Sequence, residues 1–156
     1  MDDTALMRRA LLQAERAKQA GELPYGAVLA SRDGRILAET HDEVASQRDP
    51  TAHAELLAVQ RATAAEGSDL SGCRLVSTAE GCAMCMMAAW LAGVAVVQYG
   101  ASMAEIKALR ADALDEIGVP AAELAARFER RMEVRAGLLR DDCLALWRSP
   151  DRAPSA

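Results

Sequence analysis

The chain has 156 residues, of which 51% are hydrophobic and 26% are charged, and its formal net charge is −5 at pH 7. The length predicts a single domain over residues 1–156, and the composition is ordinary for a soluble globular protein. The acidic balance gives no general attraction to nucleic acid or anionic lipid. No apolar run approaches the ~20 residues that span a bilayer, and residues 1–20 mix acids and bases unlike a signal peptide.

Four cysteines are spaced in a way that does not suggest a disulfide framework. Cys82 and Cys85 are close neighbours, while Cys73 and Cys143 stand alone. This pattern favours a reduced protein that uses cysteine for metal or redox chemistry. We therefore expect a cytoplasmic location and no membrane partner.

The first part of the chain predicts a helix, a hairpin and a second helix. Residues 3–20 have apolar positions at helical spacing and are closed by Gly21. The runs YGAVLAS and ILAET flank an Asp-Gly turn and predict two hairpin strands. A polar loop is expected over residues 41–50, and Thr51 is expected to cap a helix that Gly67 closes.

The remaining segments alternate between strand and helix patterns, and the run VAVVQYGA indicates a central strand that is covered on both faces. This alternation predicts an α/β fold, with helices on both faces of a mixed sheet. The expected elements are a strand at 73–79, a helix at 82–93, a strand at 94–101, helical residues at 103–131 with a break at 118–120, an edge strand within 132–138, a helix at 140–148 and a frayed tail at 149–156.

Two short motifs carry residue types suited to metal chemistry. His53 and Glu55 open one predicted helix, and Cys82 and Cys85 open the next, three residues apart on one helix face. One imidazole and two thiolates are three ligands for Zn²⁺, which leaves the fourth tetrahedral position open, as a catalytic zinc site requires. Glu55 could carry the proton of an activated water. A redox dithiol is the alternative for the cysteine pair, but it would not account for the His-x-Glu motif, and the combination is the signature of zinc-dependent base deaminases.

The runs PTAHAE, TAEGCAMC and PYGAV resemble the cytidine/deoxycytidylate deaminase superfamily, and within it the branch of guanine deaminases and tRNA-adenosine deaminases. The resemblance covers about residues 3–110. It implies a three-layer α/β/α fold with a five-stranded sheet, and usually a homodimer. It also implies that His53, Cys82 and Cys85 bind zinc and that Glu55 is the catalytic proton carrier.

The same resemblance implies further residues around the substrate. Glu80 would assist proton transfer or grip the substrate, with a purely structural role as the alternative. Asp142, beside Asp141, would either reach the pocket or lie at a solvated helix start. Ala27 and Thr78 would frame the pocket with backbone groups, and the Ala54 N–H would contact the base. Apart from the resemblance, Tyr25 could line the pocket and stack on a flat ring.

Two positions depart from the family pattern. Gly81 replaces a proline before the first cysteine, which should loosen the helix start slightly without removing a ligand. Asp42 replaces an asparagine that holds the base in the family. A carboxylate only accepts hydrogen bonds, so Asp42 should prefer a substrate edge with N–H groups or a cationic ring.

These residues predict a zinc-dependent hydrolytic deaminase of a small amino-heterocycle, such as a guanine-like purine base, a nucleoside or an aminotriazine. The alternatives are a tRNA adenosine-to-inosine deaminase and a cytosine- or cytidine-type deaminase. A zinc-stabilised scaffold is the alternative outside enzymes. A nucleic-acid partner is not expected, because arginines and acids alternate after Arg127 and form no basic stripe.

Overall fold

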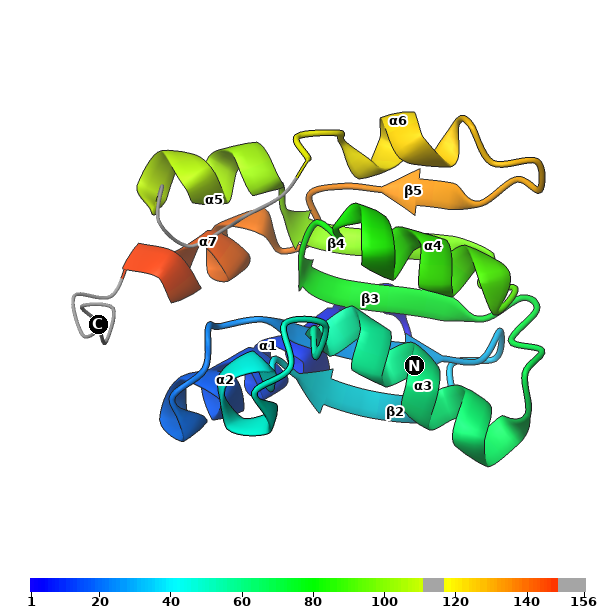
Figure 1. The fold of residues 1–156 in the computed structure, drawn as a ribbon, viewed down its shortest axis with the longest axis horizontal. Helices are drawn as coiled ribbons and strands as arrows, with labels where there is room; N and C mark the ends of the chain where they lie inside the picture. Colours follow the sequence, from blue (N-terminus) through cyan, green and yellow to red (C-terminus); the bar gives the residue numbers. More distant parts are fainter. Residues whose placement is uncertain (111–116, 149–156) are drawn as a thin grey trace.

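A single mixed sheet forms the middle of the protein (Figure 1). The computed structural model describes residues 1–110 and 117–148. Within these residues the sheet order is β2-β1-β3-β4-β5. β1 is antiparallel to both β2 and β3, whereas β3, β4 and β5 are parallel. The strands are β1 (Gly26–Ala30), β2 (Ile36–His41), β3 (Arg74–Ala79), β4 (Val96–Ala101) and β5 (Glu133–Arg135).

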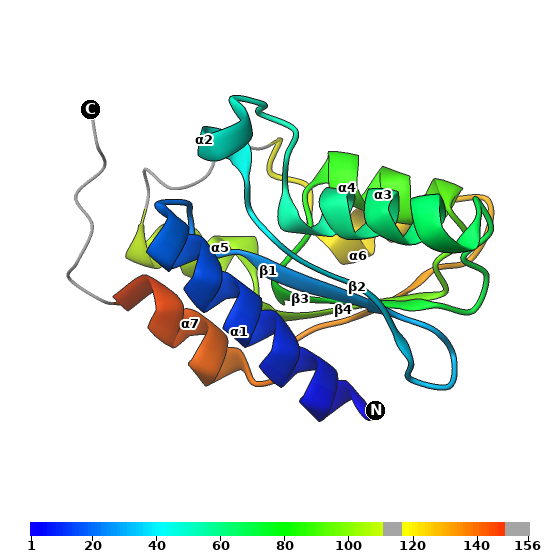
Figure 2. The same cartoon turned by 90° about the horizontal axis from the view of Figure 1, so that it is seen from below.

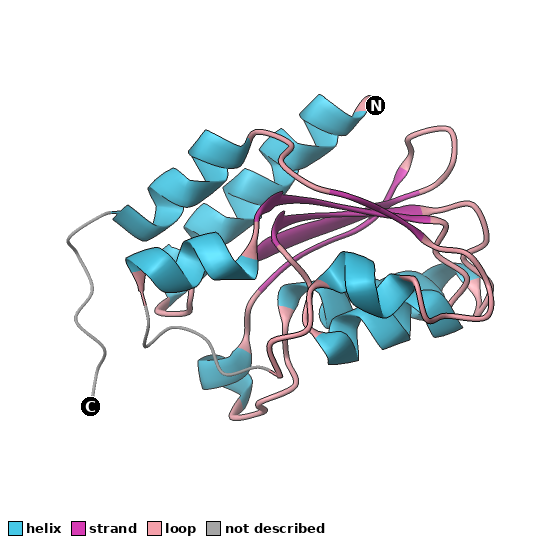
Figure 3. Cartoon of the chain, turned by 90° about the horizontal axis from the view of Figure 1, so that it is seen from above, coloured by secondary structure: helices cyan, strands magenta, loops and turns pink. Residues whose placement is uncertain are grey.

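Helices cover both faces of this sheet, and the predicted three-layer α/β/α fold is confirmed. Figure 2 shows α1 and α7 on one face and α3, α4 and α6 on the other, and Figure 3 shows the sheet as a thin layer between them. No helix in the described ranges combines the length and apolar character needed to cross a membrane. The helices are α1 (Asp3–Ala20), α2 (Val44–Gln47), α3 (Ala54–Glu66), α4 (Ala83–Leu91), α5 (Met103–Leu109), α6 (Ala121–Ala125) and α7 (Arg140–Arg148).

The first helix has the boundaries that its sequence predicts. The Asp2 carboxylate accepts a hydrogen bond from the Ala5 amide at 2.8 Å and caps the start. Gly21 ends the helix with a φ of 92°, a conformation that favours glycine. Between these caps, small and apolar side chains face the sheet and are fully buried, so the helix lies very close to β1.

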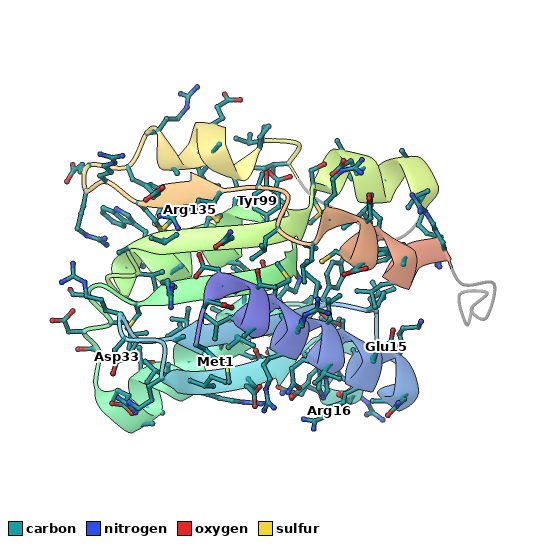
Figure 4. The ribbon with its side chains drawn as sticks, turned by 180° about the vertical axis from the view of Figure 1, so that it is seen from behind. Met1, Glu15, Arg16, Asp33, Tyr99 and Arg135 are labelled. Carbon is teal, nitrogen blue, oxygen red and sulfur yellow. The ribbon has the colours of Figure 1, made fainter. Side chains whose placement is uncertain are left out.

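Two arginines of the sheet hold the start of α1 through ion pairs with Asp3. The Asp3 carboxylate accepts hydrogen bonds from Arg74 of β3 at 2.5 Å and from Arg135 of β5 at 3.5 Å. Figure 4 shows this face from behind, with Met1 at the start of α1 and Arg135 on β5. The start of α1 is therefore tied to the central strand β3 and to the edge strand β5.

Three predictions about chain segments were wrong in detail. The loop at 41–50 contains the single turn α2, and residues 126–131 are not helical. Thr51 does not cap α3, because its amide and hydroxyl both donate to the Asp49 carboxylate, at 2.8 and 2.7 Å. The helix begins later, with His53 as its N-cap. The expected frayed tail at 149–156 lies outside the described residues.

A substitution at Gly26 tests how closely α1 packs on the sheet. A Cβ atom at this position would lie 2.0 Å from the Ala10 carbonyl oxygen and 2.5 Å from the Ala14 nitrogen. Since both are backbone atoms, Gly26→Ala must displace α1, and we expect a loss of about 1–3 kcal/mol in the free energy of unfolding, or more. Chemical denaturation measures this loss.

Gly81→Ala is the matched control. A Cβ atom there would meet no atom nearer than the Met86 sulfur at 3.4 Å, an ordinary contact. The substitution should be neutral or stabilise by up to about 1 kcal/mol, since alanine restricts the unfolded chain. Equal stability of the Gly26→Ala variant and the wild type would contradict the close packing of α1.

Candidate metal centre

The predicted ligands lie at the starts of two neighbouring helices. His53 is the N-cap of α3 and Cys82 is the N-cap of α4, and neither side chain is used in a capping hydrogen bond. Cys85 lies one turn into α4. In Figure 1 the N-terminal ends of α3 and α4 face the same end of the sheet. The three side chains are thus brought together, although the predicted place of His53 and Cys82 inside the first helical turn was wrong.

The three side chains have the separations that a tetrahedral zinc ion requires. The Cys82 and Cys85 sulfurs are 3.6 Å apart, and they lie 3.6 and 3.7 Å from Nδ1 of His53. Zn–S bonds of about 2.3 Å and Zn–N bonds of about 2.0–2.1 Å at tetrahedral angles give S···S near ~3.8 Å and S···N near ~3.5–3.6 Å. Nitrogen and sulfur are also the donor types that zinc prefers. These residues therefore fit a zinc ion.

The pKa values of His53, Cys82 and Cys85 depend strongly on the contacts among these three side chains. Hydrogen bonds from Cys85 and His53 lower the pKa of Cys82 to about 4. The hydrogen bond to Cys82 raises the pKa of His53 to about 9, while the same Cys82 contact and burial raise the pKa of Cys85. A divalent cation would replace these protons, because it binds thiolates and neutral imidazole.

Two buried carboxylates lie beside the ligands. Glu55, two residues after His53 in the first turn of α3, is 6% exposed, and burial raises its pKa to about 7. Asp42, at the end of β2, is 4% exposed, and burial raises its pKa to about 6. The charge of His53 and the nearby Val44 amide oppose this rise in the pKa of Asp42, so both lie within electrostatic reach of its carboxylate. Both groups are therefore placed in the surroundings of the metal ligands.

Hydroxyl groups of the strands join β1 to β3 and hold the start of α3 on β2. Ala27 of β1 lies opposite Thr40 of β2 and Ser77 of β3. The Thr78 hydroxyl accepts a hydrogen bond from the Gly26 amide at 3.1 Å. The Thr40 hydroxyl donates to the Ala54 carbonyl at 2.7 Å, which joins β2 to the first turn of α3. Sequence reasoning missed Thr40, because a threonine in a strand carries no signal of such a contact.

Glu80 lies two residues before Cys82 and holds two other helices. Its carboxylate oxygens accept hydrogen bonds from the Met103 amide at 2.9 Å and from the Ala121 amide at 2.7 Å. These amides are the first of α5 and α6, and the side chain is 6% exposed. These bonds give Glu80 a structural part; its predicted part in catalysis stays a prediction.

Tyr25 and Asp142 have surroundings different from those of the ligands. The Tyr25 ring meets the Trp147 ring edge-on, with centroids 5.0 Å apart. Asp142 is exposed at the start of α7, which packs on β4 in the layer opposite α3 and α4. The structure therefore brings neither side chain into the group of His53, Cys82 and Cys85, and their predicted substrate contacts stay predictions.

Comparison with known proteins identifies the relatives of this site. Residues 1–101 match the family model for the cytidine and deoxycytidylate deaminase zinc-binding region. The chain belongs to this deaminase family. It is 38% identical over 96 residues to a tRNA-specific adenosine deaminase of Aquifex aeolicus, an alignment that covers 61% of this chain and 63% of that protein. It is also 42% identical over 139 residues to the tRNA(Ile)-lysidine synthase of Thermus thermophilus. This alignment covers 89% of this chain but only 24% of that protein.

Two groups of solved structures share the fold. Guanine deaminase from Nitrosomonas europaea superimposes with a TM-score of 0.80 at 31% identity, covering 93% of this chain and 82% of that one. A structure from a study of tRNA:A34 deaminases gives a TM-score of 0.77 at 29% identity, covering 92% and 99%. The structures similar to this chain thus include a guanine deaminase and one from a study of transfer-RNA deaminases.

The two histidines of the chain allow a matched test of the metal centre. His53→Ala removes one of three ligands, and we expect zinc affinity to fall by more than ~100-fold, since even residues that only orient a ligand cost 10–100-fold. His41→Ala removes a side chain whose Nδ1 lies 2.8 Å from the Asp42 carbonyl oxygen, and it should retain zinc. Metal analysis after dialysis against a chelator measures both. Equal zinc content in the two variants would contradict the assignment of His53 as a zinc ligand.

Proposed function

We propose that this chain is a zinc-dependent hydrolytic deaminase that releases ammonia from an amino-substituted purine or a related small heterocycle. The observation that carries the proposal is the three-ligand group of His53, Cys82 and Cys85 with the buried Glu55 beside it. Three protein ligands leave one tetrahedral position open for water, which distinguishes a catalytic from a structural site. Membership of the deaminase family supports the same reaction class.

The chemistry divides between the metal and Glu55. A zinc ion held by the three ligands would polarise a water molecule and lower its pKa towards neutrality. Glu55 takes a proton from the attacking water and delivers a proton to the departing amino nitrogen, so that ammonia leaves and the ring carbon keeps the oxygen. Its burial keeps competing bulk water away, and its place two residues after His53 keeps it close to the reacting atoms.

Glu55→Gln tests the proton carrier. Glutamine fills the same volume but cannot accept and return a proton, so we expect kcat to fall by ~10²–10⁴-fold or more while zinc content is unchanged. Ammonia release is measured with a panel of guanine, adenine, cytosine, their nucleosides, pterins and aminotriazines.

Glu66→Gln serves as the control, because Glu66 forms an exposed ion pair with Arg35 and lies at the far end of α3. Retained ammonia release in Glu55→Gln would overturn the catalytic role of this residue. No ammonia from wild type with any member of the panel or with RNA would favour a zinc-stabilised scaffold instead.

The second part of the proposal is that Asp42 determines which substrates the protein prefers. Its buried carboxylate lies within electrostatic reach of His53. As a carboxylate it can only accept, so it favours a substrate edge with N–H or NH₂ groups and disfavours a carbonyl or a ring-nitrogen lone pair. A mismatch leaves two acceptors face to face in a buried site, which costs about 1–3 kcal/mol.

Asp42→Asn tests this preference directly. Pairs of purines that differ only by an amino or an oxo group at one position are compared by kcat/KM. We expect the wild type to favour the amino member, and Asp42→Asn to reduce that ratio of kcat/KM values by ~5–150-fold, which corresponds to about 1–3 kcal/mol. If both proteins rank every pair alike, Asp42 does not select the substrate.

A second candidate substrate is adenosine in transfer RNA. The names of the relatives in Aquifex aeolicus and Streptococcus pyogenes favour it, the latter at 35% identity over 143 residues. The charges of the described part of the C-terminal segment favour the small heterocycle, because three of its arginines form ion pairs with acids, which weakens their attraction to phosphate. The pairs are Arg127 with Glu123, Arg135 with Glu133, and Arg140 with Glu105. A transfer RNA with adenosine at the wobble position therefore joins the substrate panel.

A homodimer stays part of the proposal. α4 has no charged or hydrogen-bonding side chain apart from Cys85 and Trp90, yet Met87 and Leu91, one turn apart, are 42% and 72% exposed. Adjacent apolar side chains of this size at the surface mark an interaction site when they are part of a larger patch. A second copy of the chain would cover them.

A further inference from the structure

Glu22 is a buried acid that neither the sequence motifs nor the proposed mechanism uses. It follows Gly21 at the end of α1, where its amide donates to the Ala17 carbonyl at 2.9 Å. The residue is 3% exposed. A buried carboxylate is costly unless it is hydrogen-bonded, so its partners indicate what it does.

Both carboxylate oxygens of Glu22 bind the start of α2. Oε2 accepts a hydrogen bond from the Ala45 amide at 2.9 Å and Oε1 accepts one from the Ser46 amide at 2.7 Å. α2 has four residues, and its own N-cap residue, Glu43, makes no capping hydrogen bond with its side chain. A single helical turn is not stable by itself. Glu22 thus supplies, from outside the helix, the cap that α2 lacks.

Asp42 lies directly before this capped segment. The nearby Val44 amide stabilises the Asp42 carboxylate and opposes the effect of burial on its pKa. Glu22 binds the next two amides of α2. Glu22 therefore holds the segment that begins two residues after Asp42.

The segment that Glu22 holds leads directly to the metal ligand. The Glu43 amide donates to the Ala52 carbonyl at 3.0 Å, which closes residues 43–52 into a loop just before His53. Asp42 is anchored at the other end, where its amide donates to the Tyr25 carbonyl at 3.1 Å. The position of α2 thus fixes the course of the chain between the substrate-selecting carboxylate and the zinc ligand.

We propose that Glu22 is a positioning residue for substrate binding, which acts by capping α2 and thereby holding the Asp42 carboxylate towards the metal centre. The proposal rests on the proposed function for its kinetic part. Its structural part concerns only the order of residues 42–52. The two parts are therefore tested by separate measurements on the zinc-loaded protein.

The first measurement is amide hydrogen exchange in Glu22→Ala. We expect the amides of residues 44–47 to exchange at least about tenfold faster than in wild type, with α3 and zinc content unchanged, because local opening follows the loss of the cap. Glu66→Ala is the matched control, since it also removes a carboxylate that accepts two hydrogen bonds, here from exposed Arg35. Unchanged exchange in Glu22→Ala overturns the proposal, whether or not the protein is an active deaminase.

The second measurement is steady-state kinetics on the best substrate of the panel. We expect Glu22→Ala to raise KM by about tenfold or more with kcat much less affected, the pattern of lost binding. Glu22→Gln keeps one acceptor oxygen and should recover part of the effect. If Glu22 acts through Asp42, the Glu22→Ala/Asp42→Ala double variant should match Asp42→Ala alone, because coupled residues are not additive. Multiplying effects, or a fall in kcat alone, would show that Glu22 does not position Asp42.

Discussion

The start of a helix is the point at which a chain can present a side chain at a fixed place, and this protein uses two such points side by side. α3 begins after His53 and α4 begins after Cys82, so both N-cap side chains are free to face a shared centre. The sheet sets the distance between them. α4 follows β3 directly, and the Thr40 hydroxyl joins the first turn of α3 to β2. The ligand separations of 3.6–3.7 Å depend on these connections.

Local patterns were enough to predict that His53, Cys82 and Cys85 come together, because these residues belong to short motifs. His53 with Glu55, and Cys82 with Cys85, lie within three residues of one another, and a helix places such neighbours predictably. The layers followed from the alternation of strand and helix patterns. The predicted start of α3 was wrong because the Thr51 hydroxyl donates a hydrogen bond to the Asp49 carboxylate instead of capping the helix. The sequence alone does not show which of two competing local hydrogen bonds forms.

Residues that act through tertiary contacts could not be predicted in the same way. Glu22 is 23 and 24 positions from the amides that it caps, and Glu80 is 23 and 41 positions from those that it holds. An acidic residue in a loop carries no mark of a distant partner. Both carboxylates nonetheless do the same physical work, since each binds the free amides at the starts of short helices that would not hold their places alone.

The two amides bound by Glu80 have a consequence for how this scaffold can vary. Met103 begins α5 and Ala121 begins α6, so one carboxylate, two residues ahead of a zinc ligand, pins both ends of the intervening chain. A substitution that removes the Glu80 carboxylate would therefore free the starts of two helices at once. Because Glu80 lies only two residues ahead of Cys82, we expect this position to vary less than the helices that it holds.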